Sequence, residues 1–394
     1  MYKKNIAFLH EEYPFGGAEK VTSDVGQYLA MHGFNIYIFT CRINEALLNE
    51  EDKKVFTFVL FEKKNLFNYQ RNNLLVQKAR DKCMDVIIFV GGHLKVNHHR
   101  IARSIGCKYI FSLHGTPFWE IENLRQSYLR KAITRKMLLS RWKYKYYKPL
   151  VFDLYRRRIL GRYHSIYKKC DAFTVLTQSY KDTIRTSLRL SDARKIHVIP
   201  NAQVTPEMPY STKKKNQIIY VGRLSYTDKR ADRLVEIWRR IYKKFPDWEV
   251  LIVGTGEEFE NLRLSIKKQE LPRITLCGST NNTYNYYNTA SILCMTSTIE
   301  SWGLVLTEAQ QAGVIPIAFN CSAGVKEIIA PSGTNGFLVD CFDLEQYEQK
   351  LTLLMRNEFL RAEMQRNVML KSAEYDIENV GLKWIEAIES ALAK

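Results

Sequence analysis

The sequence of 394 residues lacks the features of membrane-spanning, disulfide-bonded and metal-dependent proteins. No apolar run approaches the roughly 20 residues that a membrane-spanning helix needs, and the first apolar stretch is too short for a signal peptide. The eight cysteines are scattered without a Cys-x-x-Cys pair, which favours reduced core residues over a disulfide framework or a zinc site. No Asp-x-Asp follows a predicted strand in a phosphate-binding context, so no metal ion or other cofactor is expected. These absences predict a globular, cytoplasmic protein.

Acidic residues are fewer than basic ones, 41 against 59, and the resulting net charge of +18 is concentrated in one segment. Residues 124–169 contain fifteen Lys and Arg residues but one acid, Asp153, which gives this stretch a charge of +14 and leaves about +4 for the rest. Apolar residues recur in it mostly every three to five positions. This spacing predicts a helix with an apolar stripe beside a basic face, interrupted near Pro149.

Short apolar strands alternate with helices in two successive series, which predicts an α/β protein with two mostly parallel sheets. The first series of predicted strands is Asn5–Leu9, Asn35–Thr40, Val55–Leu60, Asp85–Val90, Lys108–Leu113, Ala172–Thr177 and Ile196–Ile199. The second is Ile218–Val221, Glu249–Val253, Ile274–Cys277, Ile292–Met295, Val314–Ala318 and Phe337–Val339. Predicted helices include Ala18–Met31, Leu66–Cys83 and Ile377–Ala393. The polar stretch 202–216 predicts a linker between two domains, 1–201 and 217–375.

Two carboxylates eight residues apart, Glu300 and Glu308, form the most informative motif. Residues 291–297 predict a strand, and residues 303–311 predict the first turns of a helix that opens on Gly303. A strand that leads into such a helix presents free backbone N–H groups and the positive end of a helix dipole to a phosphate. Because carboxylates accept hydrogen bonds from sugar hydroxyls, the combination favours a sugar nucleotide. A buried strand and an amphipathic helix with two incidental glutamates are the structural alternative.

Positive charge follows the predicted strand Ile218–Val221. Gly222 and Arg223 end this strand, and Lys229 precedes a helix that is expected to begin near Ala231. The planar guanidinium and the lysine point charge could hold a diphosphate from two sides. A lone surface cation is usually only solvated. Here, however, both cations leave the carboxyl end of a strand, where open α/β sheets bind their ligands.

Taken in order, the motifs resemble those of the retaining GT-B glycosyltransferases of family 4, and among them the enzymes of bacterial capsular and surface polysaccharide synthesis. The matching pieces are Gly16-Gly17-Ala18-Glu19-Lys20, His114-Gly115, Ile199-Pro200-Asn201, Val221-Gly222-Arg223-Leu224 with Lys229, Gly254-Thr-Gly256, and Glu300 with Glu308. The chain has Ser301-Trp302 where the family often has Gly-Phe, and Arg230 where it often has Gly, which leaves the donor sugar open. The resemblance implies two Rossmann-like domains facing a central cleft, and a C-terminal helix, about 376–394, that crosses back onto the first domain.

The resemblance also implies roles for individual residues. Arg223 and Lys229 would neutralise the departing diphosphate, together with backbone amides at the start of the helix. Glu300 would hold hydroxyls of the donor sugar, Glu308 those of the ribose, and His114 would orient the donor sugar or the acceptor. The expected catalytic residues are His114, Arg223, Lys229 and Glu300. The expected donor site comprises Gly17, Gly222, Arg223, Lys229, Glu300, Gly303, Leu304, Val305 and Glu308.

The reaction implied by the resemblance is transfer from a UDP- or GDP-linked sugar to a growing, lipid-linked surface glycan with retention of anomeric configuration. We expect attack from the face that the diphosphate leaves, with the departing phosphate accepting the acceptor's proton. The basic segment 124–169 is expected to bind the anionic inner face of the cytoplasmic membrane, where this acceptor is held. The candidate membrane and acceptor contacts are Arg130, Lys131, Trp142, Arg156, Arg157 and Arg158.

Two other interpretations are compatible with the sequence. The basic segment, with its interleaved Tyr and Trp, would suit a polyanion- or nucleic-acid-binding protein. Such a protein would not need the paired carboxylates and cations, so no nucleic-acid partner is expected. The second alternative is another enzyme on the same architecture, such as a phosphorylase or a sugar-nucleotide epimerase, although no residue marks the Schiff-base lysine of a cofactor-dependent phosphorylase.

Overall fold

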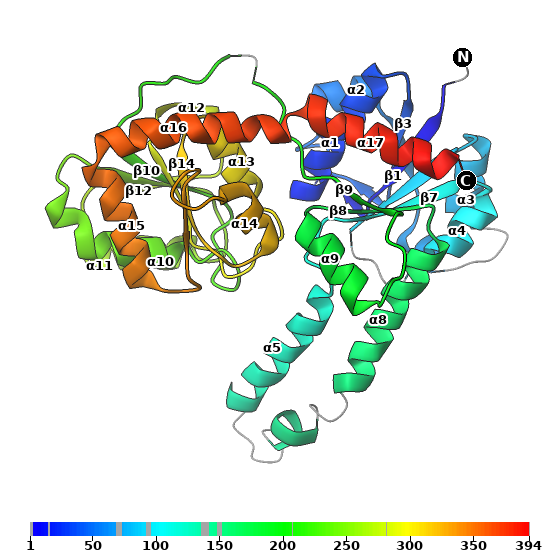
Figure 1. Ribbon diagram of the computed structural model, residues 1–394, viewed down its shortest axis with the longest axis horizontal. Coiled ribbons are helices and arrows are strands. Elements are labelled where there is room, and N and C mark those ends of the chain that lie inside the picture. Colours follow the sequence, from blue (N-terminus) through cyan, green and yellow to red (C-terminus); the bar gives the residue numbers. More distant parts are fainter. Residues whose placement is uncertain are drawn as a thin grey trace. The chain divides into compact units, whose positions relative to one another are not determined.

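A computed structural model describes residues 3–14, 16–67, 73–91, 96–134, 142–147, 152–206, 208–280 and 282–393. The chain divides into two compact units (Figure 1). Unit 1 consists of Met1–Pro200 together with Gly381–Lys394, and unit 2 consists of Asn201–Val380. Each unit contains its own parallel sheet.

Unit 1 is built on a seven-stranded sheet in the order β5-β3-β1-β6-β7-β8-β9, and all of its pairings are parallel. The strands are β1 (Asn5–Leu9), β3 (Asn35–Thr40), β5 (Thr57–Leu60), β6 (Val86–Val90), β7 (Lys108–Leu113), β8 (Ala172–Val175) and β9 (Ile196–Val198). A separate short pair joins β2 (Glu12–Tyr13) to β4 (Arg42–Ile43). The central strands β1 and β6 are buried along their whole length, which explains their continuous apolar runs.

The helices of unit 1 follow its strands along the chain. They are α1 (Gly17–Met31), α2 (Glu50–Val55), η1 (Lys63–Leu66), α3 (Leu74–Asp81), α4 (His98–Ile105), α5 (Trp119–Thr134), η2 (Lys143–Tyr147), α8 (Phe152–Lys169) and α9 (Gln178–Ser187). Helix α17 (Ile377–Leu392) begins in unit 2 and belongs to unit 1 from Gly381 onward. Its Trp384 packs edge-on against Phe8 of β1, with ring centroids 6.3 Å apart.

Unit 2 repeats the plan with six parallel strands in the order β12-β11-β10-β13-β14-β15. These are β10 (Gln217–Val221), β11 (Glu249–Val253), β12 (Ile274–Gly278), β13 (Ile292–Met295), β14 (Ile315–Phe319) and β15 (Phe337–Val339). Its helices are α10 (Ala231–Ile241), η3 (Tyr242–Lys244), α11 (Phe259–Lys268), α12 (Tyr284–Thr289), α13 (Leu304–Gln311), α14 (Ala323–Ile329), α15 (Leu344–Arg356), α16 (Glu358–Ser372) and η4 (Ala373–Tyr375).

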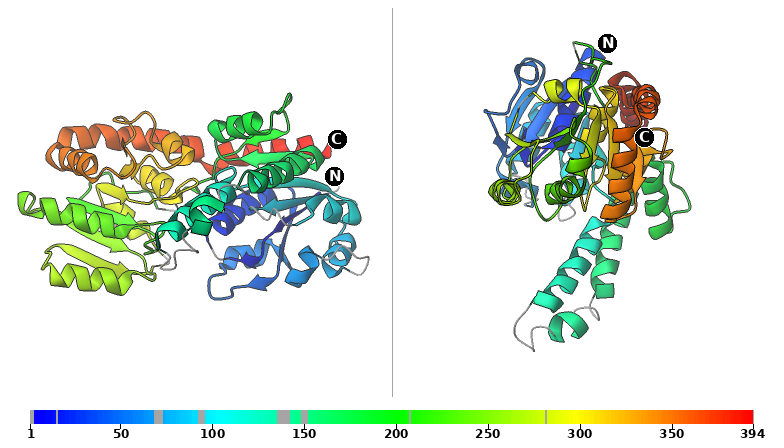
Figure 2. Two further views of the ribbon diagram at one scale, coloured as in Figure 1. Left: turned by 90° about the horizontal axis from the view of Figure 1, so that it is seen from below. Right: turned by 90° about the vertical axis from the view of Figure 1, so that its left-hand side faces the viewer.

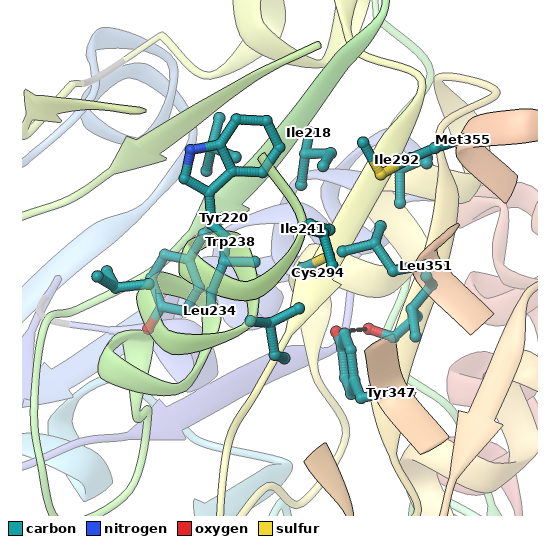
Figure 3. Close-up of a cluster of buried hydrophobic side chains, with 14 of the residues drawn as sticks. Ile218, Tyr220, Leu234, Trp238, Ile241, Ile292, Cys294, Tyr347, Leu351 and Met355 are labelled. Atoms are coloured by element: carbon teal, nitrogen blue, oxygen red, sulfur yellow. Dashed lines mark hydrogen bonds between the residues drawn. The ribbon is translucent and has the colours of Figure 1, made fainter. Parts of the chain in front are cut away.

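The core of unit 2 fills the space between its sheet and the helices α10 and α15 (Figure 3). Trp238 of α10 and Tyr347 of α15 are fully buried in it, and the polar group of each donates a hydrogen bond. The Trp238 indole donates to the Pro272 carbonyl at 3.0 Å, and the Tyr347 hydroxyl donates to the Ile317 carbonyl at 2.7 Å. Satisfied polar atoms let these large rings contribute their apolar area without a desolvation penalty.

Helices α5 and α8 lie side by side and extend away from the sheet of unit 1 (Figures 1 and 2). The basic segment therefore forms two helices and the π-helical turn η2, where a single interrupted helix was predicted; Pro149 lies outside the described residues. Ile159 and Tyr163 are buried on α8, and the Tyr163 ring packs against Phe118 at 4.8 Å. Buried apolar residues of α8 thus anchor the helix pair in unit 1.

Several predicted boundaries differ from the structure by one or two residues, and the helix predicted over 66–83 differs more. Val55 ends helix α2, whose cap is the Asn49 side chain, so the strand predicted from Val55 starts at Thr57. Of the helix predicted over 66–83, residues 68–72 lie outside the described part of the structure. Leu66 belongs to η1, and α3 covers Leu74–Asp81 with Asn73 as its N-cap.

The stretch 202–216, which the sequence predicts as a linker, makes contacts with the rest of unit 2. Gln203 forms a β-bridge with Asp376, and the Ser211 amide donates to the Asn288 side chain at 2.6 Å. The whole stretch accordingly belongs to unit 2.

Candidate active site

The strand order of unit 2 reverses between β10 and β13. The loops after these two strands carry five of the predicted donor-site residues: Gly222, Arg223, Lys229, Glu300 and Gly303. In open α/β sheets, ligands bind at the carboxyl ends of the strands on either side of such a reversal. The two loops are joined by hydrogen bonds: the Thr298 amide donates to the Asp228 carbonyl at 2.6 Å, and the Thr296 hydroxyl donates to the Arg230 carbonyl at 2.8 Å. The motifs around Arg223 and Glu300 therefore form one site.

Lys229 and Glu300 contact each other directly across the two loops. The Lys229 ammonium donates to Glu300 Oε1, and the Ser297 hydroxyl donates to the same oxygen at 3.0 Å. Only 11% of the Glu300 side chain and 28% of the Lys229 side chain are exposed. The pair is thus shielded from water, which strengthens its interaction with any charged group that enters the site.

Arg223 extends from the same loop into solvent, with 66% of its side chain exposed. Its Nη2 lies 2.6 Å from Asp228 Oδ2. Burial favours protonation of Asp228, but the Ser225 hydroxyl and the positive charges of Arg223 and Lys229 hold the pKa of its carboxyl below the ordinary value. Asp228 is therefore a charged acceptor that orients the Arg223 guanidinium, and it also accepts from the backbone amide of Lys229 at 3.1 Å.

The glycines of the predicted Gly-x-Gly motif allow two backbone segments to touch. A Cβ on Gly254 would collide with the Gly222 carbonyl oxygen, and a Cβ on Gly256 would collide with the Leu224 carbonyl oxygen. The Gly222 amide donates to the Val253 carbonyl at 3.0 Å, so this contact supports the loop that carries Arg223. The motif therefore allows close backbone packing next to the site.

Arg230 adopts a left-handed backbone conformation, with φ +54°, at the position where the resembling family often has glycine. Such a conformation costs a side chain of this size on the order of 1–3 kcal/mol. Two contacts offset the strain: the Arg230 guanidinium bonds to Asp232, with Nη2 and Oδ2 2.8 Å apart, and it lies 4.2 Å from the centre of the Tyr226 ring. Arg230 can therefore occupy the turn before α10 at the position where the family often has glycine.

Helix α13 begins next to Glu300. Gly303 caps it with φ +93°, and the backbone amides of Leu304 and Val305 form its first turn, which holds no acidic residue. Glu308 lies in the second turn, and its Oε2 accepts a hydrogen bond from the Tyr287 hydroxyl at 2.9 Å. Burial, and then the charge of Glu308, raise the pKa of Tyr287, so the hydroxyl remains a donor.

The predicted site residues of unit 1 lie at the carboxyl ends of its strands. His114 directly follows β7, and its Nε2 is 3.1 Å from the Ser112 hydroxyl, which accepts from the Thr174 hydroxyl at 2.8 Å. Gly17 begins helix α1, one residue earlier than predicted.

Sequence reasoning missed the contact beside Gly17 between the partly exposed Glu19 and the buried His10. Glu19 Oε2 accepts from the Gly16 amide at 2.9 Å, and Glu19 Oε1 lies 3.4 Å from Nδ1 of the buried His10. Burial would raise the pKa of Glu19, but its interactions with His10 and with the Gly16 amide lower it below the ordinary value. The only signal in the sequence was the position of Glu19 in the first turn of a glycine-opened helix.

The predicted membrane contacts lie on the helix pair of α5 and α8. Arg156, Arg157 and Arg158 are exposed on α8, and Trp142 is exposed next to η2. Arg130 and Lys131 belong to α5, but their side chains lie outside the described part of the structure. Within the described residues, no helix is both long and apolar enough to span a membrane, and no three His, Cys, Asp or Glu residues are grouped as metal ligands would be.

Two protein families match the chain, essentially one on each unit. Residues 15–203 match the family described as Glycosyltransferase Family 4, and residues 206–371 match the family described as Glycosyl transferases group 1. Every motif of the predicted donor site, from Gly17 to Glu308, lies within one of these two matches. The matches therefore agree with the resemblance that the motifs indicated.

Curated relatives are also glycosyltransferases. An uncharacterized glycosyltransferase of Haemophilus influenzae is 27% identical over 375 residues, covering 94% of this chain and 95% of its own. The amylovoran biosynthesis glycosyltransferase AmsD of Erwinia amylovora is 34% identical over 173 residues, covering 44% of this chain and 48% of its own. A Campylobacter jejuni N-acetyl-D-galactosaminyltransferase, named for a glycan on PP-undecaprenol, is 24% identical over 246 residues, covering 62% of this chain and 65% of its own.

Solved structures confirm the architecture. Anabaena Alr3699/HepE, crystallised with UDP-glucose, superposes with a TM-score of 0.73 at 16% identity, covering 98% of this chain and 99% of its own. At this identity the likeness establishes the fold, which is the GT-B fold expected from the motifs. With the two family matches and the curated relatives, these findings identify the chain as a glycosyltransferase of the GT-B fold.

Proposed function

We propose that the chain transfers a hexose from a UDP- or GDP-linked sugar to a growing, lipid-linked surface glycan, with retention of anomeric configuration and without a metal ion. The observation that carries this proposal is the meeting of Lys229 and Glu300, beside Arg223 and the start of α13, where the strand order of unit 2 reverses. Cations, amides and carboxylates converge there as a diphosphate and its two sugars would require.

The charges of the site suggest which residues would contact each part of the donor. Arg223 and Lys229, with the amides of Leu304 and Val305, would neutralise the diphosphate as it departs. Glu300 would bind hydroxyls of the donor sugar, and Glu308 those of the ribose. UDP-glucose in the similar Anabaena protein supports a nucleotide-linked donor.

The proposed reaction needs no nucleophile and no proton acceptor from the protein. The acceptor hydroxyl attacks the anomeric carbon from the face on which the bond to the diphosphate breaks. The departing phosphate oxygen accepts the proton of that hydroxyl. His114, at the end of β7, would orient the donor sugar or the acceptor. Same-face attack of this kind retains the anomeric configuration.

Transfer assays with a panel of UDP- and GDP-sugars test the reaction, and we expect the activity to survive EDTA because the two cations replace a metal ion at the diphosphate. The product should be identified by mass spectrometry and its anomeric configuration by NMR. Loss of transfer on chelation, restored by Mg²⁺ or Mn²⁺, would contradict metal independence. Inversion at the anomeric carbon would contradict same-face attack.

We further propose that the helix pair α5 and α8 binds the anionic inner face of the cytoplasmic membrane, which holds the lipid-linked acceptor. Aromatic side chains are exposed at η2, which lies at the far end of the pair (Figure 1), and Trp142 and Tyr146 form a ring contact there at 6.3 Å. The arginines 156–158 are exposed on α8. Aromatic rings in the headgroup layer beside cations are typical of interfacial helices. The undecaprenol-linked glycan in the name of the Campylobacter relative supports a lipid-linked acceptor.

Replacing Arg156, Arg157 and Arg158 together by glutamine should weaken binding to anionic liposomes about a hundredfold, because each cation near such a surface is worth about 1 kcal/mol. Co-sedimentation with anionic and neutral vesicles, at low and high salt, measures this. A matched control removes three exposed cations of unit 2, Lys243, Lys244 and Lys267, and should bind as the wild type does. Equal wild-type binding to anionic and neutral vesicles, or none to either, would refute docking by charge.

A further inference from the structure

We propose that Tyr287 is a positioning residue for the nucleoside: its hydroxyl holds the Glu308 carboxylate in the orientation that meets the ribose. The inference rests on the proposed function, in which Glu308 binds the ribose hydroxyls. Tyr287 belongs to none of the sequence motifs and lies 21 positions before Glu308.

The geometry restricts Glu308 from one side. The Tyr287 hydroxyl donates to Glu308 Oε2 at 2.9 Å. Tyr287 is only 1% exposed, so the donor side of this bond is shielded from solvent, whereas Glu308 is partly exposed. One carboxylate oxygen is thereby occupied, which fixes the direction in which the other oxygen and the remaining lone pairs can accept. A carboxylate held in this way loses little rotational freedom when a sugar hydroxyl binds.

Tyr287 is itself held because its helix, α12, is fixed by the stretch that precedes β10. Lys214 Nζ donates to the carbonyl of Tyr287 at 2.9 Å and to that of Asn288 at 3.1 Å. Burial lowers the pKa of Lys214 to about 8. At the other end of α12, the Tyr284 ring stacks on Tyr210 with centroids 4.7 Å apart. Tyr287 therefore lies on a short helix that is held by contacts at both ends.

A second contact fixes helix α13 one residue before Glu308. The buried Gln203 side chain donates to the Thr307 hydroxyl at 2.6 Å, and that hydroxyl donates to the Leu304 carbonyl at 2.9 Å. The helix backbone at Glu308 is thus held through Gln203, and the side chain through Tyr287. Both supports come from outside α13, so the carboxylate does not depend on its own helix alone for its position.

The test compares a ribonucleotide with its analogue that lacks the ribose hydroxyls, UDP and 2′,3′-dideoxy-UDP, or the guanosine pair if the wild type binds GDP instead. Calorimetry on the full chain should show that Tyr287→Phe weakens binding of the ribonucleotide about tenfold, which corresponds to about 1.4 kcal/mol. Binding of the dideoxy analogue should change less than about twofold, because it has no hydroxyl for Glu308 to meet. Equal losses for both nucleotides, or no loss for either, would overturn the inference.

Two further variants separate this inference from the function on which it rests. Tyr347→Phe removes another fully buried hydroxyl of unit 2, which donates to the Ile317 carbonyl and not to a proposed donor-site residue, and should bind both nucleotides like the wild type. Glu308→Ala removes the acceptor and should abolish the preference for the ribonucleotide. If Glu308→Ala keeps that preference, the ribose assignment of the proposed function fails. If Glu308→Ala loses it while Tyr287→Phe keeps it, only the positioning role fails.

Discussion

Replacing Lys229 by alanine should lower the rate of sugar transfer about 10²–10³-fold, equivalent to about 2.7–4 kcal/mol of transition-state stabilisation. The leaving diphosphate gains negative charge as its bond to the sugar breaks, and Lys229 is the more buried of the two cations proposed to meet that charge. The same ammonium also neutralises Glu300. The variant should therefore also leave a buried carboxylate without its counter-charge. Arg223→Ala should act in the same direction through the second cation.

The measurement is steady-state transfer together with the midpoint of thermal unfolding, because loss of the ion pair affects stability as well as rate. The double variant Lys229→Ala with Glu300→Gln removes the unpaired charge and should recover stability without recovering activity. Lys268→Ala, an exposed lysine of the same unit, provides the control. A folded Lys229→Ala protein with wild-type turnover would sink the assignment.

Replacing Gly254 by alanine should destabilise unit 2 by about 3 kcal/mol or more and abolish donor binding. Two costs combine at this position: the backbone has φ +141°, and a Cβ would collide with the Gly222 carbonyl oxygen. Both obstacles are backbone, so neither can be relieved by a change of rotamer. Relief would require moving the loop that carries Arg223, and the site would be lost with it.

Gly333→Ala separates the two costs, since Gly333 has φ +93° but an added methyl group would meet no atom nearer than the Phe337 ring, at 4.0 Å. It should cost only about 1 kcal/mol and leave nucleotide binding unchanged. Chemical denaturation and calorimetry with UDP or GDP measure both effects. A Gly254→Ala protein as stable as Gly333→Ala would show that the loops can separate without penalty.

The strands and the consecutive site motifs could be predicted from the sequence because their signals are local. Lys108–Leu113 and Ile292–Met295 are short apolar runs ended by polar or small residues, and both have the predicted bounds. Arg223 and Glu300 could be singled out because each follows such a run. In a parallel sheet that position alone places a residue at the ligand-binding edge.

The partners of those residues could not be predicted, because they come from distant parts of the chain or depend on backbone conformation. Gln203 and Thr307 are 104 positions apart, and no pattern links them. Asp228 precedes Lys229 directly, yet its contact with Arg223 depends on how the loop folds back. Val55 lies in an apolar run but ends helix α2, which begins outside that run at the cap residue Asn49.

The return of α17 to unit 1 has a consequence for how the protein is made. Phe8 and Tyr28 belong to elements that leave the ribosome early, whereas their partners Trp384 and Gly381 follow only after the whole of unit 2. A Cβ at Gly381 would strike the Tyr28 ring, so the helix seats closely on α1. Until translation reaches it, the nascent first unit exposes this apolar face. Synthesis of the second unit is therefore the interval in which a chaperone would be needed most.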